Sequence, residues 1–363
     1  MRKQTVWMIA PVAAAAVLAA ACGGGAEKPA AGTGTAAAGT TKAAASASAT
    51  AKVDPNTLAA KKASPGSLAV DDPAWNGAPV MKAQMELIKG TKPTEAGVVE
   101  AQALYSDTDV WFRFQWADTT EDRGRPYIYD GSKWALSARM TDRLSLLWPI
   151  GTITGFEAKG CYAACHREGS DDKATAIDAK TTYMILPKAG DKADNWQWTG
   201  ESSAPVGQVD DLRFEGALAD PKVLSSAIVK DKLDSGGPLS NAVPTPGVGP
   251  AKMQDPAKKA TYGAAYLAAA DAIAIDPSKF KAGDKVPRRL AAPWVGSEGD
   301  IDSKASYAAG KWTVVMHRKL DTKNADDIKF EAGKSYLFEI AVWDGIDHEN
   351  HTIAKDVYTL TLK

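Results

Sequence analysis

Short runs in which every second residue is apolar are the strongest constraint on the fold of this chain. In residues 110–116, the side chains of Phe112, Phe114 and Trp116 fall on one face. Half-buried β-strands give this pattern. The same alternation gives three further one-sided sets: Trp312, Val314 and Met316; Tyr336, Phe338, Ile340 and Val342; and Tyr358, Leu360 and Leu362. Strands towards both ends, with no strand–helix–strand rhythm, predict a mainly β fold, an antiparallel β-sandwich with long inserted loops.

The middle of the chain, residues 155–300, has a different composition. It is rich in Gly, Pro, Asp and Lys, which indicates long loops inserted between the strands of the sandwich. Residues 261–275 are rich in alanine and predict one helix. Long loops in a compact domain are usually functional, so we expect the site in this region.

The first 21 residues have the features of an export signal. Two basic residues at positions 2 and 3 precede an apolar run over residues 6–21. The run ends in Leu-Ala-Ala-Ala-Cys, which resembles a bacterial lipoprotein signal, although its leucine stands four positions before Cys22 and not three. The resemblance implies a lipid on Cys22, and Gly23 after it implies the outer membrane, facing the periplasm or the cell surface. The alternative is an ordinary cleaved signal with an incidental cysteine.

The sequence predicts three segments. Residues 1–21 are the signal, and residues 22–65 are the lipidated cysteine followed by a flexible linker of Ala, Gly, Ser and Thr that has little apolar surface to bury. Residues 66–363 form one folded domain, which holds ten of the eleven tryptophans. The 43 basic and 44 acidic residues give a formal charge of −1, so we expect no nucleic-acid partner.

Cys161, Cys165 and His166 form the most informative cluster of the chain. They read Cys-Tyr-Ala-Ala-Cys-His, one residue longer than the usual Cys-x-x-Cys-His attachment of c-type haem. In such a site each cysteine sulfur bonds one haem vinyl group and the adjacent histidine supplies an axial nitrogen to the iron. The extra residue is tolerable because Ala163 and Ala164 are small. The pattern predicts one covalent haem c.

Two other readings of the cysteines stay open. A Cys161–Cys165 disulfide is plausible in an exported protein, but it would not need His166. A zinc site would need a further ligand, and His317, His348 and His351 are the other histidines of the chain.

From about residue 68 onward the chain resembles the haem-binding domain of the ethylbenzene dehydrogenase γ-subunit family, in its c-type branch. The segments that carry the resemblance are residues 72–75 (DPAW), 110–118 (VWFRFQWAD), 142–149 (DRLSLLWP), 160–166 (GCYAACH), 194–198 (DNWQW), 310–315 (GKWTVV), 318–320 (RKL) and 341–344 (AVWD). The resemblance implies a sandwich whose inserted loops hold a haem. The opening strands are also similar to carbohydrate-binding sandwiches.

The resemblance also implies two axial ligands to the iron. One is His166, and the other lies just before the final strand, where His351 is the first choice and His348 the alternative. A methionine is a further possibility, with Met140, Met184 and Met316 as candidates. The chain departs from many relatives in carrying Gln197 where they have histidine.

These inferences predict an extracytoplasmic c-type cytochrome lipoprotein that transfers single electrons through a six-coordinate haem and is not an enzyme. Its partners would be an unidentified redox protein and, through the lipid, the membrane. Two alternatives remain: the haem-binding subunit of a molybdenum oxidoreductase complex, and a haem-free module of the carbohydrate-binding type.

Overall fold

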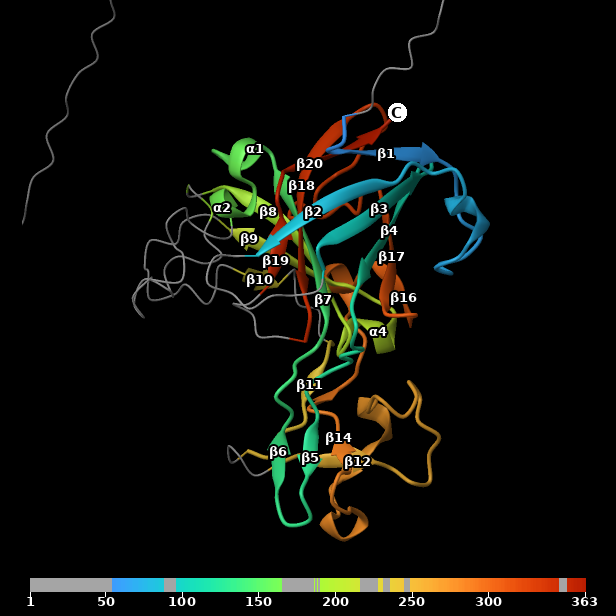
Figure 1. Cartoon of the computed structure of the whole chain (residues 1–363), viewed down its shortest axis with the longest axis vertical. Helices are drawn as coiled ribbons and strands as arrows, with labels where there is room; N and C mark the ends of the chain where they lie inside the picture. The colour runs from blue at the N-terminus through green and yellow to red at the C-terminus, as the bar shows by residue number, and fades with distance from the viewer. Residues whose placement is uncertain are drawn as a thin grey trace, which may run out of the picture. The chain divides into compact units, whose positions relative to one another are not determined.

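The computed structural model describes residues 54–87, 96–164, 186, 188, 190–215, 228–230, 236–244, 249–345 and 351–363. Figure 1 shows a large curled sheet with smaller sheets of two and three strands beyond one of its ends. No helix among these residues is long and apolar enough to cross a membrane.

The main sheet has 13 strands. Its hydrogen-bonded order is β10 (Ile228–Lys230), β9 (Asp210–Glu215), β8 (Lys192–Thr199), β7 (Arg143–Ile150), β18 (Ser335–Trp343), β19 (Thr352–Ala354), β2 (Met81–Leu87), β3 (Val98–Tyr105), β4 (Asp109–Ala117), β17 (Lys311–Lys319) and β16 (Asp302–Ala308). Off this path, β1 (Thr57–Lys62) pairs with β20 (Tyr358–Leu362) and β3, and β20 also pairs with β18.

The smaller elements lie between these strands in the sequence. The short sheets are β14 (Lys285–Val286) with β5 (Tyr127–Tyr129) and β6 (Trp134–Leu136), β11 (Leu239–Ser240) with β15 (Arg289–Leu290), and β12 (Lys252–Gln254) with β13 (Ala272–Ala274). The described helices are α1 (Phe156–Lys159), α2 (Cys161–Ala164), α4 (Ser203–Val206) and four 3₁₀ turns at Pro73–Trp75, Ala269–Asp271, Pro277–Lys279 and Gly296–Gly299.

The main sheet folds over so that its two halves face each other across an aromatic core. Trp148 on β7 lies 5.6 Å from Phe112 on β4, and Trp116 on β4 lies 6.1 Å from Trp198 on β8, measured between ring centroids. Apart from the parallel pairs of β1, the strands of the main sheet pair antiparallel. The predicted antiparallel β-sandwich is therefore confirmed, and all four alternating sets supply residues of this core or pack against it.

Three details differ from the expectations. Strand β1 begins at Thr57, so the sandwich starts before residue 66; its alternation was hidden in an alanine-rich segment. The middle region contributes β8 and β9 to the main sheet, and is therefore more than inserted loops. The helix expected over residues 261–275 is wrong, because that segment holds turns, a 3₁₀ turn and β13, which pairs with β12.

One buried ion-pair cluster joins the halves of the sandwich. Arg318 of β17 is 1% exposed and donates to the Asp194 carboxylate of β8 at 3.0 Å. Its guanidinium carbon also lies 4.7 Å from the ring centroid of Trp196. Asp211 and Asp327 lie 3.9 and 3.8 Å away from the same guanidinium. Removing Arg318 would leave several buried carboxylates without their cation, so we assign it a structural role.

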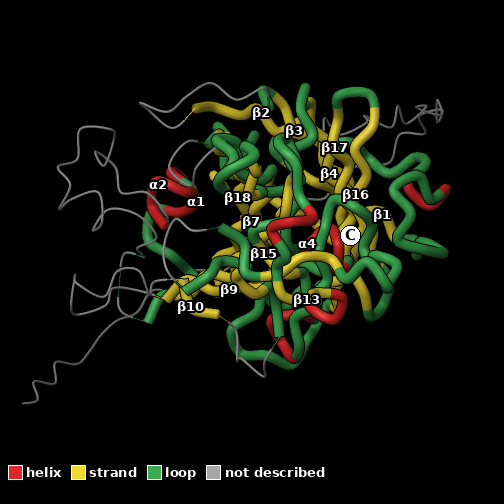
Figure 2. The backbone as a smooth tube through the Cα atoms, turned by 90° about the horizontal axis from the view of Figure 1, so that it is seen from below, coloured by secondary structure: helices red, strands yellow, loops and turns green. Residues whose placement is uncertain are grey.

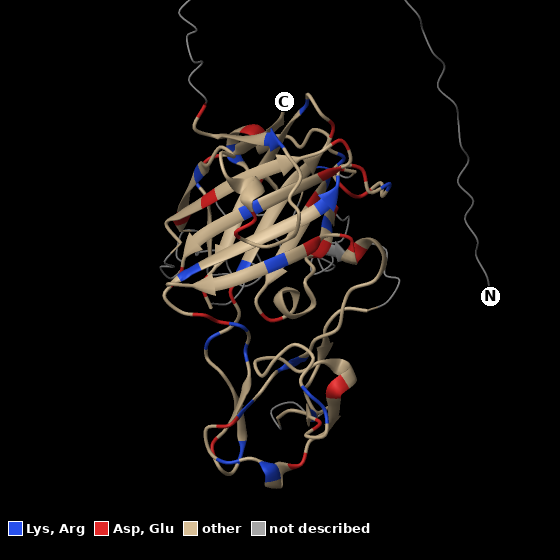
Figure 3. Ribbon diagram, turned by 90° about the vertical axis from the view of Figure 1, so that its right-hand side faces the viewer, with Lys and Arg blue, Asp and Glu red and all other residues tan. Residues whose placement is uncertain are grey.

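Figure 3 shows positive and negative residues interspersed along the strands and loops of the face turned to the viewer.

Candidate functional site

The helices α1 and α2 lie against the outer face of the sheet formed by β7, β8 and β18 (Figure 2). Each is a single turn, and Gly160 separates them with a φ of +50°. A Cβ atom at residue 160 would lie 1.6 Å from Oε1 of Glu339. Glycine is therefore required here, both for its backbone conformation and for the close approach of Glu339.

Cys161 follows directly and is buried, with 6% of its surface exposed. It belongs to a second apolar core, which we call the outer cluster. The outer cluster consists of Leu147, Ile153, Phe156, Cys161, Ala164, Leu186, Ala193, Phe214, Ala341, Trp343 and Ile353. Its members come from β7, β8, β9, β18 and β19 as well as from α1 and α2. The first cysteine of the predicted attachment thus faces an apolar surface of the sheet and is shielded from water.

Glu339 is an ionisable residue buried beside the outer cluster. It lies on β18, opposite Leu147 of β7, and only 3% of its surface is exposed. Burial raises the pKa of this carboxyl well above its usual value, although the carboxylate accepts hydrogen bonds from the backbone of Cys161 and Ile340. Its Oε2 has no hydrogen-bond partner among the described residues. Burial next to Cys161 therefore favours the protonated form of this carboxyl.

His351 lies at the opposite end of the same face, immediately before β19. It is 4% exposed, and its ring stacks on Trp343 with centroids 4.3 Å apart and planes inclined by 21°. Trp343 is itself a member of the outer cluster. The outer cluster therefore includes both Cys161 and the tryptophan on which His351 stacks, although these residues are far apart in sequence.

The structure places the remaining candidates as follows. Cys22, Cys165, His166, His348 and Met184 lie outside the described residues. His317 lies on β17 in the other half of the sandwich, where its ring nitrogens face Asp109 at 2.9 Å and Asp302 at 3.3 Å. Met316 is fully buried in the main core and so points away from the outer cluster.

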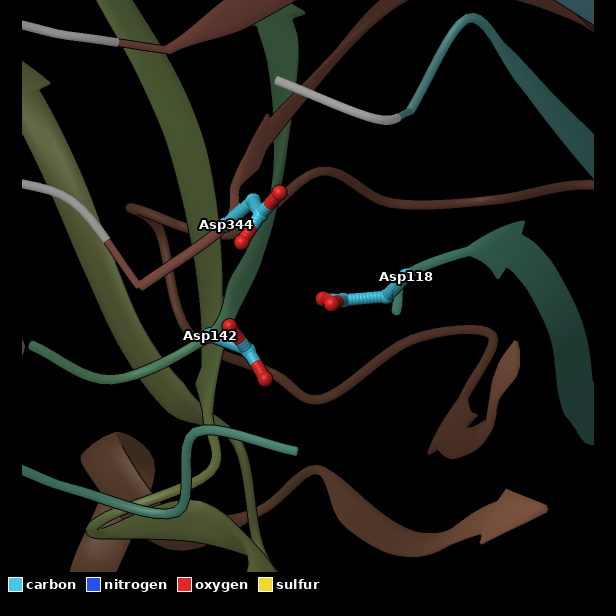
Figure 4. A group of neighbouring side chains, drawn as sticks. All are labelled: Asp118, Asp142 and Asp344. Carbon is cyan, nitrogen blue, oxygen red and sulfur yellow. The ribbon is translucent and has the colours of Figure 1, made fainter. Parts of the chain in front are cut away.

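A second group, three carboxylates, was not singled out from the sequence. The side chains of Asp118, Asp142 and Asp344 point toward one another from three different segments (Figure 4), with oxygens within 4.8 Å of one another. Asp142 accepts hydrogen bonds from the backbone of Asp122 at 2.7 Å and Gly345 at 2.9 Å, and from the Trp312 indole at 2.9 Å. Asp142 therefore connects the loops at Asp122 and Gly345 with strand β17.

Two of these carboxyls bind protons unusually tightly. Burial raises the pKa of Asp118 to about 7 and that of Asp142 to about 8, and the charges of neighbouring acids add to both shifts. Arg139 donates to Asp344 at 2.7 Å and to Asp122 at 2.7 Å. The group thus combines two carboxyls of raised pKa with a third that is paired with Arg139. No pattern in the sequence could reveal it, because its members are spread over more than 200 positions.

The fold defines an antiparallel β-sandwich that carries a second apolar core, with one cysteine and one histidine, on an outer face. The chain belongs to the ethylbenzene dehydrogenase family, whose model matches residues 72–353. This confirms the resemblance drawn from the sequence at the level of the family; the match does not address the c-type branch.

The solved structures that resemble the chain are distant. One is a family 9 carbohydrate-binding module from Caldicellulosiruptor kristjanssonii in complex with glucose, with 8% identity, a TM-score of 0.31, and coverage of 85% of this chain and 95% of the module. Another is a putative carbohydrate-binding protein from Bacteroides uniformis, with 8% identity, a TM-score of 0.33, and coverage of 85% and 99%. Likeness at this level says nothing about ligands. No curated protein sequence matches the chain significantly.

Proposed function

We propose that this protein is an exported, lipid-anchored c-type cytochrome that transfers single electrons. Cys161 and Cys165 would carry one haem c through thioether bonds, and His166 and His351 would be its axial ligands. The observation that carries the proposal is the outer cluster, because it holds buried Cys161 and also Trp343, on which buried His351 stacks. A bound haem supplies a reversible one-electron change at its iron.

The described residues fit such a group in three respects. The Cys161 thiol is the chemical group that a haem vinyl needs, and it lies among apolar side chains. A neutral imidazole such as that of His351 is a good iron ligand, and its stacking on Trp343 limits its rotation. The apolar side chains around both residues exclude water, which is one of the means by which a protein sets a haem potential.

The decisive experiment is haem analysis of protein matured in a host with c-type cytochrome assembly. We expect a c-type pyridine haemochrome spectrum and haem that stays on the chain during denaturing electrophoresis. Replacing Cys161 and Cys165 by alanine should abolish the covalent haem, whereas Cys22→Ala should retain it. A colourless wild-type protein would sink the proposal and favour a haem-free binding module.

The axial assignment is tested by comparing three histidine variants. His351→Ala should give a high-spin or ligand-exchanged spectrum and a raised potential. His317→Ala should leave the spectrum unchanged, because that ring lies in the other half of the sandwich against Asp109. If His348→Ala has the effect expected of His351→Ala, the distal ligand is His348 and not His351. A near-infrared sulfur-to-iron band would identify a methionine ligand.

Two further parts of the proposal concern the setting of the protein. Cys22→Ala should release the protein from membranes or leave its signal uncleaved; a fully soluble wild-type protein with an unmodified N-terminus would contradict a lipid anchor. Copurification with a large catalytic chain would identify the protein as a subunit of an oxidoreductase complex and not a free carrier.

A further inference from the structure

A pocket lined by arginines opens on the same outer face as the proposed haem site. It has a volume of about 220 Å³. Arg143, Gln197 and Asp210 line it from β7, β8 and β9, and Arg288 and Arg289 line it from the segment that leads into and forms β15. Thr141, Thr199, Glu201, Ser202, Pro238 and Trp294 complete the lining. We call it the arginine pocket.

The charges of the arginine pocket favour an anionic ligand. Three guanidinium groups face two carboxylates, those of Glu201 and Asp210. Glu201 is shared, because it accepts from Arg288 at 3.0 Å and lies 3.7 Å from Arg289. The three guanidinium groups exceed the two carboxylates by one positive charge. Guanidinium groups recognise carboxylates with paired hydrogen bonds, so a carboxylate is the ligand chemistry that fits.

Strand pairing joins the arginine pocket to the outer cluster. Arg143 is the register partner of Trp343, on which His351 stacks. Four residues further along β7, Leu147 belongs to the outer cluster with Cys161 and lies opposite Glu339. Both residues of β7 point to the outer face, since strand side chains alternate, and they stand about 13 Å apart at ~3.3 Å per residue.

We propose that Arg143 and Arg288 bind the propionate carboxylates of the haem, which fixes the orientation of the ring on the outer face. This inference rests on the proposed cytochrome function. The vinyl groups of a haem occupy one half of the ring and its propionates the other. Arg143 and Arg288 would hold the propionates of a ring that is attached through Cys161 and extends along β7.

The test measures the midpoint potential of the haem-loaded protein as a function of pH. Arg143→Gln and Arg288→Gln should keep the covalent haem, lower the potential and make it more dependent on pH near neutrality, because an unpaired propionate titrates there. Arg143→Lys keeps the positive charge and should therefore lower the midpoint potential less than Arg143→Gln does. Arg113→Gln is the matched control, because Arg113 is a part-buried arginine on β4 that donates to Val70 and Gln102.

Each outcome decides between the two proposals. If haem is covalent but neither pocket variant changes the potential or its pH dependence, the propionate assignment is wrong and the cytochrome function stands. If the wild-type chain carries no covalent haem, both proposals fall. If calorimetry then shows succinate binding that Arg288→Gln abolishes, the pocket takes a free carboxylate and not a propionate. Thermal melting of each variant checks folding; Arg288 is partly exposed and so its replacement should be tolerated.

Discussion

The two faces of the sheet made by β7, β8 and β18 differ sharply in chemistry. The inner face is aromatic: Trp148, Trp196 and Phe338 pack with ring centroids 4.8 to 5.3 Å apart. The outer face combines apolar side chains with Glu339, Arg143 and the stacked pair of Trp343 and His351, all of them buried.

Core residues and outer-face residues therefore alternate along the same strands. Because successive residues of a strand point to opposite faces, β18 contributes Phe338, Ile340 and Val342 to the core and Glu339, Ala341 and Trp343 to the outer face. Burying a carboxyl has a cost, and inside the sandwich Arg318 offsets that cost for Asp194 by pairing with it. The following predictions test the contrast between the two faces.

The largest effect is expected from a matched pair of tryptophan variants. Trp148→Ala should lower the free energy of unfolding by about 3–5 kcal/mol, because the ring is fully buried among Phe112, Trp196 and Phe338. Trp343→Ala should cost less, and under the proposed cytochrome function it should change the haem spectrum, because it removes the ring on which His351 stacks. Urea denaturation and visible spectra measure both. Equal losses of stability with no spectral change would mean that the outer face is simply a second core.

The next effect concerns the approach of Gly160 to Glu339. Gly160→Ala should destabilise the protein by about 2–4 kcal/mol, because a Cβ would collide with the Glu339 carboxyl and the positive φ is strained. Gly151→Ala is the control, since its φ is also positive, at +80°, but no atom lies within 4 Å of the added Cβ. In a Glu339→Ala background, Gly160→Ala should cost less free energy of unfolding, because the collision with the Glu339 carboxyl is then absent. If the two glycine variants cost the same, the close approach to Glu339 contributes nothing.

A smaller effect is expected from the pH dependence of the carboxylate group. The pKa of Asp118 is raised from 3.8 to about 7. Its contribution to the free energy of unfolding is therefore fully present below pH 4 and is lost as the pH rises through 7. Asp118→Asn should therefore raise stability at pH 8 by on the order of 1–2 kcal/mol and leave it little changed at pH 4. Melting temperatures between pH 4 and 8 measure this. The prediction fails if the wild-type protein becomes more stable as the pH rises and less stable when a chelator is added. That result would mean that the carboxylates are ionised and hold a cation.

The smallest effect is expected from the N-terminal segment. Deleting residues 23–52 should change stability by less than about 0.5 kcal/mol, because their composition offers little apolar surface to bury. Extending the deletion through residue 62 should be clearly destabilising, because it removes β1, whose Leu58 is fully buried and which pairs with β20 and β3. Calorimetric melting of the two truncations checks the boundary; similar values for both would mean that β1 contributes no stability.

Much of the fold could be predicted from local pattern. The alternation in residues 110–116 and 336–342 reports burial on one face, and the structure confirms it for Phe112 and Phe338. Strand β1 and the region over residues 261–275 were misjudged for one reason: alanine is compatible with helix, strand and turn, so only the neighbouring strands decide. The failure of the predicted helix shows tertiary pairing overriding local propensity.

The candidate site divides in the same way. The sequence by itself determined the spacing of Cys161, Cys165 and His166, since an attachment motif is contiguous along the chain. Only the tertiary structure decided that Trp343 stacks on His351 beside the outer cluster, that Glu339 is buried against Gly160, and that arginines from β7 and residues 288–289 line one pocket. The reason is physical: these contacts depend on which strands pair and in what register, and the free energy that selects the pairing is spread over the whole buried core.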